Sequence, residues 1–362
     1  MERHQKGYRL HVFNPEHDLA LAANLARFTA PRAGRELRRD LGFLPALWAE
    51  EGDLVLVDDV ALAENGMKPF AEKMARVRLV TRNDLLMLHR SGEEVSTVDP
   101  WGWDVSLVQQ LRKCVSDSLL PDNEWLERVR SMSHRRFSSE KFLPVLTALD
   151  GRLTGDSCMV ESLNGMPYGL PVVLKSPWSS TGRGVRYARD EAGWSHNLTW
   201  AERVIAQQGG IMVEPLYNKV CDFAMEFQVE SPAEETSSQR QTRYLGLSLF
   251  TTERGAYTGN LVATEHQKRA RLGSYVDLDL LDSVRDAIVS LADRHIAPAY
   301  EGPFGVDMMM VEMDGKVCLH PCVELNLRRT MGHVALMFDP EKHIRQLRIV
   351  YEGGRYRLTT TS

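Results

Sequence analysis

The chain has 362 residues, enough for two or three domains at roughly 150 residues each. Hydrophobic residues make up 43% and charged residues 26%, with 26 Gly and 16 Pro; these values lie near globular averages and exclude disordered, collagen-like and coiled-coil classes. Lys plus Arg total 44 against 49 Asp plus Glu, so the formal charge of −5 provides no overall positive field for binding nucleic acid.

The sequence predicts a cytoplasmic protein without a membrane partner. Residues 1–13 lack the continuous apolar core of a secretion signal. No run of about 18 uncharged apolar residues predicts a transmembrane helix. The five cysteines are an odd, dispersed set, which does not indicate a disulfide framework: Cys114, Cys158, Cys221, Cys318 and Cys322.

Strand and helix signals alternate over the first 115 residues or so. Short apolar runs predict strands at 8–13, 54–57 and 77–80, and helical spacing of apolar residues occurs at 35–50 and 70–75. Such alternation is typical of a parallel sheet. The first predicted strand runs into a polar cluster at 14–18, and open α/β sheets bind ligands where strands end.

The sequence suggests a boundary near residues 121–123. Beyond it, a β-rich run ends in Lys175 and leads into the loop from Ser179 to Gly184, which contains small hydroxyl residues, two glycines and one arginine. Glycines allow the backbone to approach an anion closely, and successive N–H groups form a phosphate-binding concavity. The loop lacks the P-loop and Rossmann fingerprints. Two alternatives stay open, namely that the loop is a plain hairpin turn and that Lys175 is an ordinary strand lysine with its stem on the surface.

Further elements follow from composition and periodicity. We predict a strand at 185–188, a helix at 198–207 and a strand at 211–216. The polar stretch 231–243 is predicted to be a mobile hairpin loop between two strands. Apolar residues with helical spacing predict a helix over 281–295.

A second hairpin near the C-terminus carries the strongest chemical signal. Asp314-Gly315 is a two-residue turn signal. Regular pairing from that turn places Asp307 opposite Cys322 and Glu324 opposite Gly305.

With that pairing, Asp307, Glu324 and Asn326 point to one face of the sheet. Their hard oxygen atoms suit Mg²⁺ or Mn²⁺ bound together with nucleotide phosphates. The alternative is a solvated polar strand face, and a bulge near Pro321 would change the pairing. Cys318, His320 and Cys322 lack a second ligand pair, so their spacing does not indicate zinc.

Taken together, these motifs resemble the ATP-grasp superfamily over about residues 131 to 340. The motifs are Val-Val-Leu-Lys175-Ser-Pro, the loop Ser-Ser-Thr-Gly182-Arg-Gly184-Val, Val213-Glu214-Pro-Leu, Gly305-Val-Asp307 and Glu324-Leu-Asn326-Leu-Arg328. The region before them resembles a pre-ATP-grasp domain in position and texture.

The resemblance implies a fold and a division of the chain. The expected class is α/β and α+β, with a pre-ATP-grasp-like parallel-sheet N-terminal domain followed by a two-lobed ATP-grasp fold. We expect the first domain over 1–130, the N-terminal lobe with its Gly-rich lid over 131–215, and the C-terminal lobe with the metal site over 216–362.

It also implies roles for individual residues. The metal ligands are Asp307, Glu324 and Asn326, and the catalytic residues are Arg328 and Lys268, the latter because His266-Gln267-Lys268 is similar to a lysine-bearing segment of the biotin carboxylase branch. The family usually has a lysine at the start of the nucleotide domain; here the nearest match is His134-Arg135-Arg136. The implied ATP contacts are Arg136, Lys175, Ser180, Thr181, Gly182, Arg183, Gly184, Glu214, Pro215, Leu216 and Asp222.

The implied activity is an Mg-ATP-dependent ligase that activates a carboxylate as an acyl phosphate and couples it to an amine or similar nucleophile. Alternatives are an ATP-grasp phosphotransferase and a nucleotide-binding regulatory module without turnover. The partners are small-molecule carboxylates and amines, and a homodimer is compatible with the sequence. Two polar-aromatic clusters are expected on the substrate side, unless the tryptophans belong to the core: Asn14, Glu16, His17 and Asp18, with Trp101 and Trp103.

Overall fold

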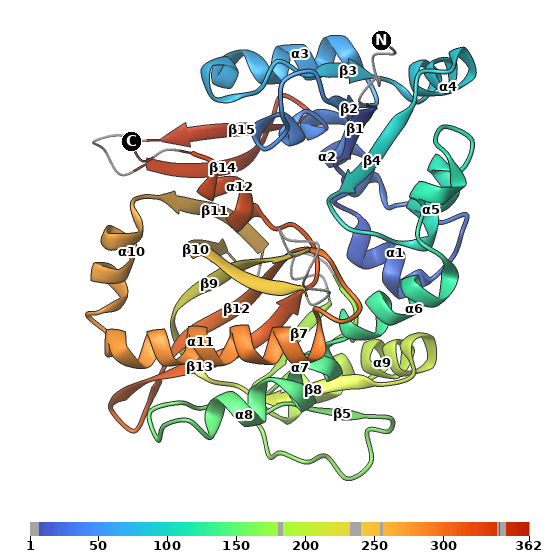
Figure 1. Cartoon of the computed structure of the whole chain (residues 1–362). Coiled ribbons are helices and arrows are strands. Elements are labelled where there is room, and N and C mark those ends of the chain that lie inside the picture. The colour runs from blue at the N-terminus through green and yellow to red at the C-terminus, as the bar shows by residue number, and fades with distance from the viewer. Residues whose placement is uncertain are drawn as a thin grey trace. The chain divides into compact units, whose positions relative to one another are not determined.

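The computed structural model describes residues 7–361 except 180–183, 232–239, 254–255, 339 and 341–344. The chain divides into two compact units (Figure 1). The first contains residues 1–127 and 347–362, and the second contains residues 128–346. No helix in the described ranges is long and apolar enough to cross a membrane.

The first unit is built on a four-stranded parallel sheet, as the alternating sequence pattern predicts. Its strand order is β3-β2-β1-β4. Strands β2 and β3 therefore lie on one side of β1, and the chain then crosses to the other side of β1 to form β4. The strands are β1 (Tyr8–Val12), β2 (Leu54–Leu56), β3 (Arg78–Val80) and β4 (Val95–Pro100).

Helices of this unit follow the strands in sequence. Side-chain caps start several of them: Asp59 accepts a hydrogen bond from Leu62 N in α3, Thr81 forms a capping box with Asp84 in α4, and Asp104 accepts a 2.9 Å hydrogen bond from Leu107 N in α5. The helices are α1 (His17–Ala23), α2 (Arg32–Leu41), α3 (Val60–Met67), α4 (Arg82–Ser91) and α5 (Val105–Leu111); α6 (Asn123–Met132) runs from the first unit into the second.

The helix expected over 35–50 is shorter than predicted. Helix α2 ends at Leu41, and Leu44–Leu47 form a separate 3₁₀ turn. Pro45 lies in that turn, and its missing N–H and fixed φ prevent the α-helix from continuing. The apolar residues that suggested one long helix are nevertheless buried, since Leu41, Leu44 and Leu47 all belong to the core.

The second unit begins with α7 (Arg135–Lys141) and α8 (Leu143–Thr147), followed by a small antiparallel sheet of order β5-β8-β6-β7. Its core contains Val172, Leu174 and Val213 from the strands, together with Ala201 and Val204 from helix α9. The elements are β5 (Cys158–Val160), β6 (Val172–Lys175), β7 (Val185–Ala188), α9 (Glu191–Gln208) and β8 (Ile211–Pro215).

A larger antiparallel sheet carries the rest of the second unit, with neighbouring strands in the order β13-β12-β9-β10-β11. The helical stripe predicted at 281–295 is confirmed in α11, where Leu281, Val284 and Ile288 are buried. Residues 232–239 of the expected hairpin loop lie outside the described residues. The elements are β9 (Asn218–Glu230), β10 (Gln241–Glu253), β11 (Ala256–Val262), α10 (Glu265–Leu272), α11 (Leu278–His295), β12 (Gly302–Met313), β13 (Lys316–Asn326) and α12 (Met331–Leu336).

The C-terminal strands differ from the expected division of the chain. Residues 347–362, assigned from sequence to the C-terminal lobe, belong to the first unit. Strand β14 (Arg345–Glu352) leads into β15 (Arg355–Thr361), and the backbone N–H of Tyr356 donates a 2.8 Å hydrogen bond to the buried Asp40 of α2. This contact joins segments 316 residues apart, which no local pattern indicates.

Candidate functional site

The hairpin of β12 and β13 positions the candidate metal ligands. Its turn is Asp314-Gly315, as predicted, with positive φ angles of 51° and 73°. Two consecutive positive φ angles are typical of a type I′ turn, whose twist matches that of the two strands. The pairing therefore starts regularly at Met313 opposite Lys316 and continues to Met309 opposite His320.

Beyond Met309 the register shifts, and the pairing expected from the sequence is wrong at the decisive position. Asp307 lies opposite Glu324, not Cys322, and Gly305 lies opposite Asn326. Three residues separate His320 from Glu324 on β13, whereas one separates Met309 from Asp307 on β12. The irregularity includes Pro321, which cannot donate a ladder hydrogen bond.

This irregularity does not move the side chains to the other face. Two additional residues on β13 are an even number, so the alternation of faces is retained. Asp307, Glu324 and Asn326 share one face, and the two carboxylates are direct cross-strand neighbours.

The two paired carboxylates repel each other. Burial raises the pKa of Asp307 well above its usual value, and the nearby Glu324 and Glu226 act in the same direction, against Arg328 and Asn326. A divalent cation would remove this repulsion. Within the described residues, no group of three or more His, Cys, Asp or Glu side chains could hold a metal ion. Two carboxylates and one amide instead fit the donor set with which Mg²⁺ is commonly bound alongside phosphate oxygens.

Arg135, which opens α7, reaches this face. It is 7% exposed, and its guanidinium donates to Glu324 Oε1 at 2.7 Å, to Ser179 Oγ at 2.8 Å and to the carbonyl oxygen of Ser176. It thus connects a metal-ligand candidate to the residues directly before the Gly-rich loop.

Arg136, the arginine selected from the sequence, points elsewhere. Its side chain is exposed and donates to Glu140, one turn along the same helix, at 2.5 Å. Neighbouring residues on a helix project about 100° apart, so the two arginines cannot both face the site. Sequence spacing could not distinguish them, because they are adjacent and chemically identical.

His134 caps α7 and so helps to position Arg135. Its Nδ1 accepts the N–H of Arg136 at 2.9 Å, and its ring packs edge-on against Trp178 at 4.4 Å. Burial lowers the pKa of His134 to about 4, and three arginines act in the same direction.

The lowered pKa of His134 predicts a pH-dependent stability. Between about pH 6.5 and pH 4 the unfolded chain gains a proton at this residue that the folded chain does not, so the free energy of unfolding falls as the pH falls. His134→Asn keeps a capping oxygen and removes the titration. We expect the loss of stability between pH 7 and pH 4, measured by urea unfolding, to shrink by on the order of 1 kcal/mol. His196→Asn, an exposed position on α9, is the matched control, and an equal change there would contradict the assignment.

Lys175 and Glu214 form a buried ion pair at the ends of β6 and β8. The Lys175 Nζ lies 2.5 Å from Glu214 Oε2, and Ser157 Oγ donates to Glu214 Oε1 at 3.2 Å. The positive charge of Lys175 also affects His320 on β13. Burial lowers the pKa of His320 to about 3, and Lys175 acts in the same direction. A positive charge from the small sheet therefore lies close to the acidic face of the large sheet.

Of the loop expected to close over a triphosphate, Ser180, Thr181, Gly182 and Arg183 lie outside the described residues. Gly184 is described, and a Cβ atom there would lie 2.2 Å from the Cβ of Ser179. The carbonyl oxygen of Gly184 accepts the N–H of Ser176 at 2.8 Å. Where the chain leaves β6 and enters β7, Gly184 therefore lies too close to Ser179 for a residue with a side chain.

The expected adenine and ribose contacts are distributed over β8 and β9. Pro215 ends β8, and the N–H of the following Leu216 donates to the carbonyl oxygen of Pro171 at 3.0 Å. Asp222 lies on β9 opposite Met309, where it accepts hydrogen bonds from Lys219 at 2.5 Å and Thr252 at 3.0 Å. Because Met309 shares the face of Asp307, so does Asp222.

Sequence reasoning missed Glu226, which lies on the same face opposite Gly305 and is 1% exposed. Thr330 Oγ1 donates to its Oε1 at 2.9 Å. From the part of the chain that the structure describes, its Oε2 receives no hydrogen bond. His333 Nδ1 lies 3.0 Å away, but that nitrogen already accepts the N–H of Thr330 at 3.1 Å. A Cβ at Gly332 would come within 1.8 Å of the carboxylate. The sequence did offer one signal for Glu226, because it is a single acidic residue within an apolar run that forms a strand.

The two expected catalytic residues differ in their surroundings. Arg328 donates to the side-chain oxygen of Asn326 at 2.8 Å, so it touches a candidate metal ligand. Lys268 is buried on α10 and donates to the carbonyl oxygen of Leu247 at 2.8 Å. Burial lowers the pKa of Lys268, while Glu265 and Glu226 oppose that effect.

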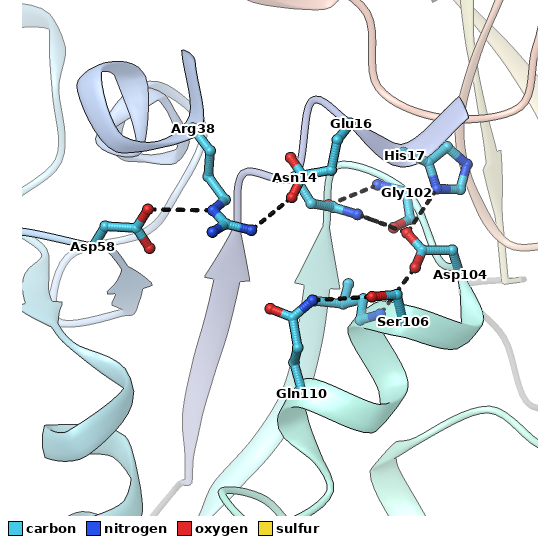
Figure 2. Close-up of polar contacts among 10 residues, drawn as sticks. Asn14, Glu16, His17, Arg38, Asp58, Gly102, Asp104, Ser106 and Gln110 are labelled. Atoms are coloured by element: carbon cyan, nitrogen blue, oxygen red, sulfur yellow. Dashed lines mark hydrogen bonds and ion pairs between the residues drawn. The ribbon is translucent and has the colours of Figure 1, made fainter. Parts of the chain in front are cut away.

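Of the residues expected on the substrate side, Asn14 and Glu16 line a cavity of about 620 Å³ in the first unit. Figure 2 shows their polar contacts. His17 is buried, with Nδ1 3.3 Å from Asp104. Trp101 packs edge-on against Phe13 at 5.0 Å, and the half-buried Trp103 packs against the hydrophobic core of this unit. Neither tryptophan lines the cavity, and nor does Asp18. The tryptophans therefore occupy core positions, the alternative that the sequence left open.

Comparison with known proteins gives matches in structure alone. No protein-family model and no curated protein sequence matches the chain. The structure is similar to the biotin carboxylase domain of 2-oxoglutarate carboxylase from Hydrogenobacter thermophilus, with 14% identity, a TM-score of 0.52, and 96% of this chain and 75% of that chain covered. It is also similar to Rhizobium etli pyruvate carboxylase, with 14% identity and a TM-score of 0.50, over 91% of this chain and 27% of that chain.

Proposed function

The chain has the fold of the ATP-grasp superfamily, and from this premise we propose that it is an Mg-ATP-dependent ligase. It activates a carboxylate as an acyl phosphate and couples it to an amine or similar nucleophile. A shared fold does not establish an activity, so the proposal depends on the site. The observation that carries it is the direct pairing of Asp307 with Glu324, flanked by Asn326 and in contact with Arg135.

In this proposal the nucleotide lies between the small sheet and the acidic face of the large sheet. Asp307, Glu324 and Asn326 hold Mg²⁺, which neutralises charge on the phosphates. Arg135 takes the phosphate role assigned from the sequence to Arg136, because it is the arginine that contacts Glu324. The other proposed ATP contacts are Lys175, Ser180, Thr181, Gly182, Arg183, Gly184, Glu214, Pro215, Leu216 and Asp222.

The chain's own residues supply positioning and charge. The substrate carboxylate attacks the γ-phosphorus of ATP, ADP leaves, and the amine then displaces orthophosphate from the acyl phosphate. Such steps need electrostatic stabilisation more than a side-chain nucleophile. Arg328, held by Asn326, places a fixed positive charge beside the acidic face. Lys268 is buried near Glu226, and its lowered pKa favours an amine that can exchange a proton.

Product analysis tests this function. The protein is incubated with ATP, MgCl₂ and a mixed pool of small carboxylates and amines, and ADP, orthophosphate and new adducts are measured by mass spectrometry. We expect orthophosphate release to require both a carboxylate and an amine. With ¹⁸O in the carboxylate, one labelled oxygen should appear in the orthophosphate, because the acyl phosphate passes that oxygen to phosphorus.

Other outcomes identify the other functions. A phosphorylated acceptor formed without any amine would indicate a phosphotransferase. Nucleotide binding without any product would indicate a regulatory module. Unlabelled orthophosphate would contradict an acyl phosphate.

A further inference from the structure

The cavity of the first unit lies where ligands bind in open parallel sheets. Its lining comes from the segments that follow β1, β2 and β3, and from the stretch between Asp104 and Lys113 that contains α5 and follows β4. In the strand order β3-β2-β1-β4, β2 and β3 lie on one side of β1 and β4 lies on the other side. The boundary between β1 and β4 is therefore a topological switch point, where the loops that follow the two strands separate and leave a crevice.

The floor of this cavity carries a carboxylate with one unused oxygen. Glu16 is 7% exposed, and its Oε1 accepts a 2.6 Å hydrogen bond from Arg38, which also donates to Asp58 at 3.3 Å (Figure 2). The Oε2 of Glu16 is buried and has no hydrogen-bond partner in the described residues. A buried carboxylate oxygen without a donor is costly. A ligand that donates a proton to it would remove that cost.

The other acidic and amide groups near the floor already have partners. Asp104 accepts hydrogen bonds from Leu107 N at 2.9 Å and from Asn14 Nδ2 at 3.2 Å. Asn14 also donates to the carbonyl oxygen of Gly102 at 2.8 Å, so its amide is committed to joining two loops. Among the described residues, Glu16 Oε2 is therefore a buried acceptor that remains open to a ligand.

The mouth of the cavity is positively charged. Four exposed cationic side chains line it without a hydrogen bond or ion pair to any described residue: Arg27, Arg35, Arg82 and Lys113. They come from the segments that follow β1, β3 and β4 and line one cavity, although the chain as a whole has a formal charge of −5. Clustered cations around a concave site attract anions and raise their local concentration.

We propose that this cavity binds a small molecule carrying an anionic group, carboxylate or phosphate, together with an ammonium group. The anion is held at the mouth by the arginines and the lysine, and the ammonium donates to Glu16 Oε2 at the floor. The inference rests on the proposed ligase only for the ligand's role, which would be that of the amine substrate. Binding itself requires no nucleotide.

The combination of charges explains why a simple anion is insufficient. An anion that reached the floor would meet the Glu16 carboxylate and be repelled, whereas a simple amine would be repelled at the mouth. A molecule with both groups satisfies both ends. Discrimination by one charge-assisted hydrogen bond is worth roughly 1.5 to 3 kcal/mol, which is about 10- to 100-fold in affinity.

Calorimetry on the full chain without nucleotide tests this inference with two matched pairs of probes. L-aspartate is compared with succinate, and phosphoethanolamine with ethyl phosphate; the members of each pair differ chiefly in the amine. We expect the amine-bearing member to bind at least about tenfold more tightly. If one pair binds and the other does not, that result identifies the anion as carboxylate or phosphate.

Variants assign the two ends. Glu16→Gln retains an oxygen for Arg38 and should abolish the preference for the amine while the affinity for the amine-free probe stays equal or rises. Arg82→Gln should weaken both members of a pair alike. Arg90→Gln, an exposed arginine on the same helix α4 that does not line the cavity, is the control and should change neither.

The inference is overturned if none of the four probes binds, if amine-bearing and amine-free probes bind equally, or if Arg90→Gln weakens binding as much as Arg82→Gln. Failure of the ligase assay does not affect these results. Conversely, ligase turnover with an uncharged amine would leave the proposed function in place and remove this ligand class.

Discussion

Glu324→Gln is expected to lower turnover at saturating ATP by about 10³-fold, which is the loss typical of removing one strong electrostatic contact to a transition state. Glutamine has nearly the same size, and its oxygen can still accept the 2.7 Å hydrogen bond from Arg135. What disappears is one negative charge directly opposite Asp307. With one carboxylate instead of two, the site should bind Mg²⁺ weakly, and the apparent Mg²⁺ requirement should rise.

The measurement is steady-state ADP release as a function of Mg²⁺ concentration, with thermal unfolding to confirm that the variant is folded. Glu312→Gln is the matched control, because Glu312 lies on β12 of the same hairpin but is exposed near the turn. Unchanged turnover and Mg²⁺ dependence in Glu324→Gln would refute the metal assignment.

Lys175→Met should weaken the binding of a non-hydrolysable ATP analogue by about 10- to 100-fold, because a buried charge-assisted contact to a phosphate or base edge contributes roughly 1.5 to 3 kcal/mol. Methionine keeps most of the apolar stem and removes the ammonium. The substitution also leaves Glu214 buried without its 2.5 Å partner, a change that destabilises proteins by about 3 to 5 kcal/mol.

A second variant separates these two effects. Lys175→Met combined with Glu214→Gln removes the uncompensated charge and should recover much of the stability, measured by urea unfolding, without recovering nucleotide affinity. Lys316→Met, an exposed lysine beside the β12–β13 turn, should change neither quantity. Recovery of affinity in the double variant would mean that Lys175 acts only by neutralising Glu214.

Local sequence patterns predicted those parts of the molecule whose cause is local. The strand at Tyr8, the turn at Asp314-Gly315 and the helical stripe at Leu281, Val284 and Ile288 follow from side-chain periodicity and from backbone angles that few residues adopt. The ATP-grasp fold was likewise recognisable from motifs that lie within single strands and loops. Each of these features depends on residues within a few positions of one another, so a single sequence is enough to predict it.

The candidate site depends on long-range contacts, which only the tertiary structure decides. The face shared by Asp307 and Glu324 was predictable, because an even register shift leaves the alternation of side chains unchanged, but their direct pairing required the irregularity at Pro321. Arg135 contacts Glu324 across 189 positions. Residues 347–362 return to the first unit. Periodicity gives the direction of each side chain along its own element, whereas the partner it meets depends on how distant elements pack.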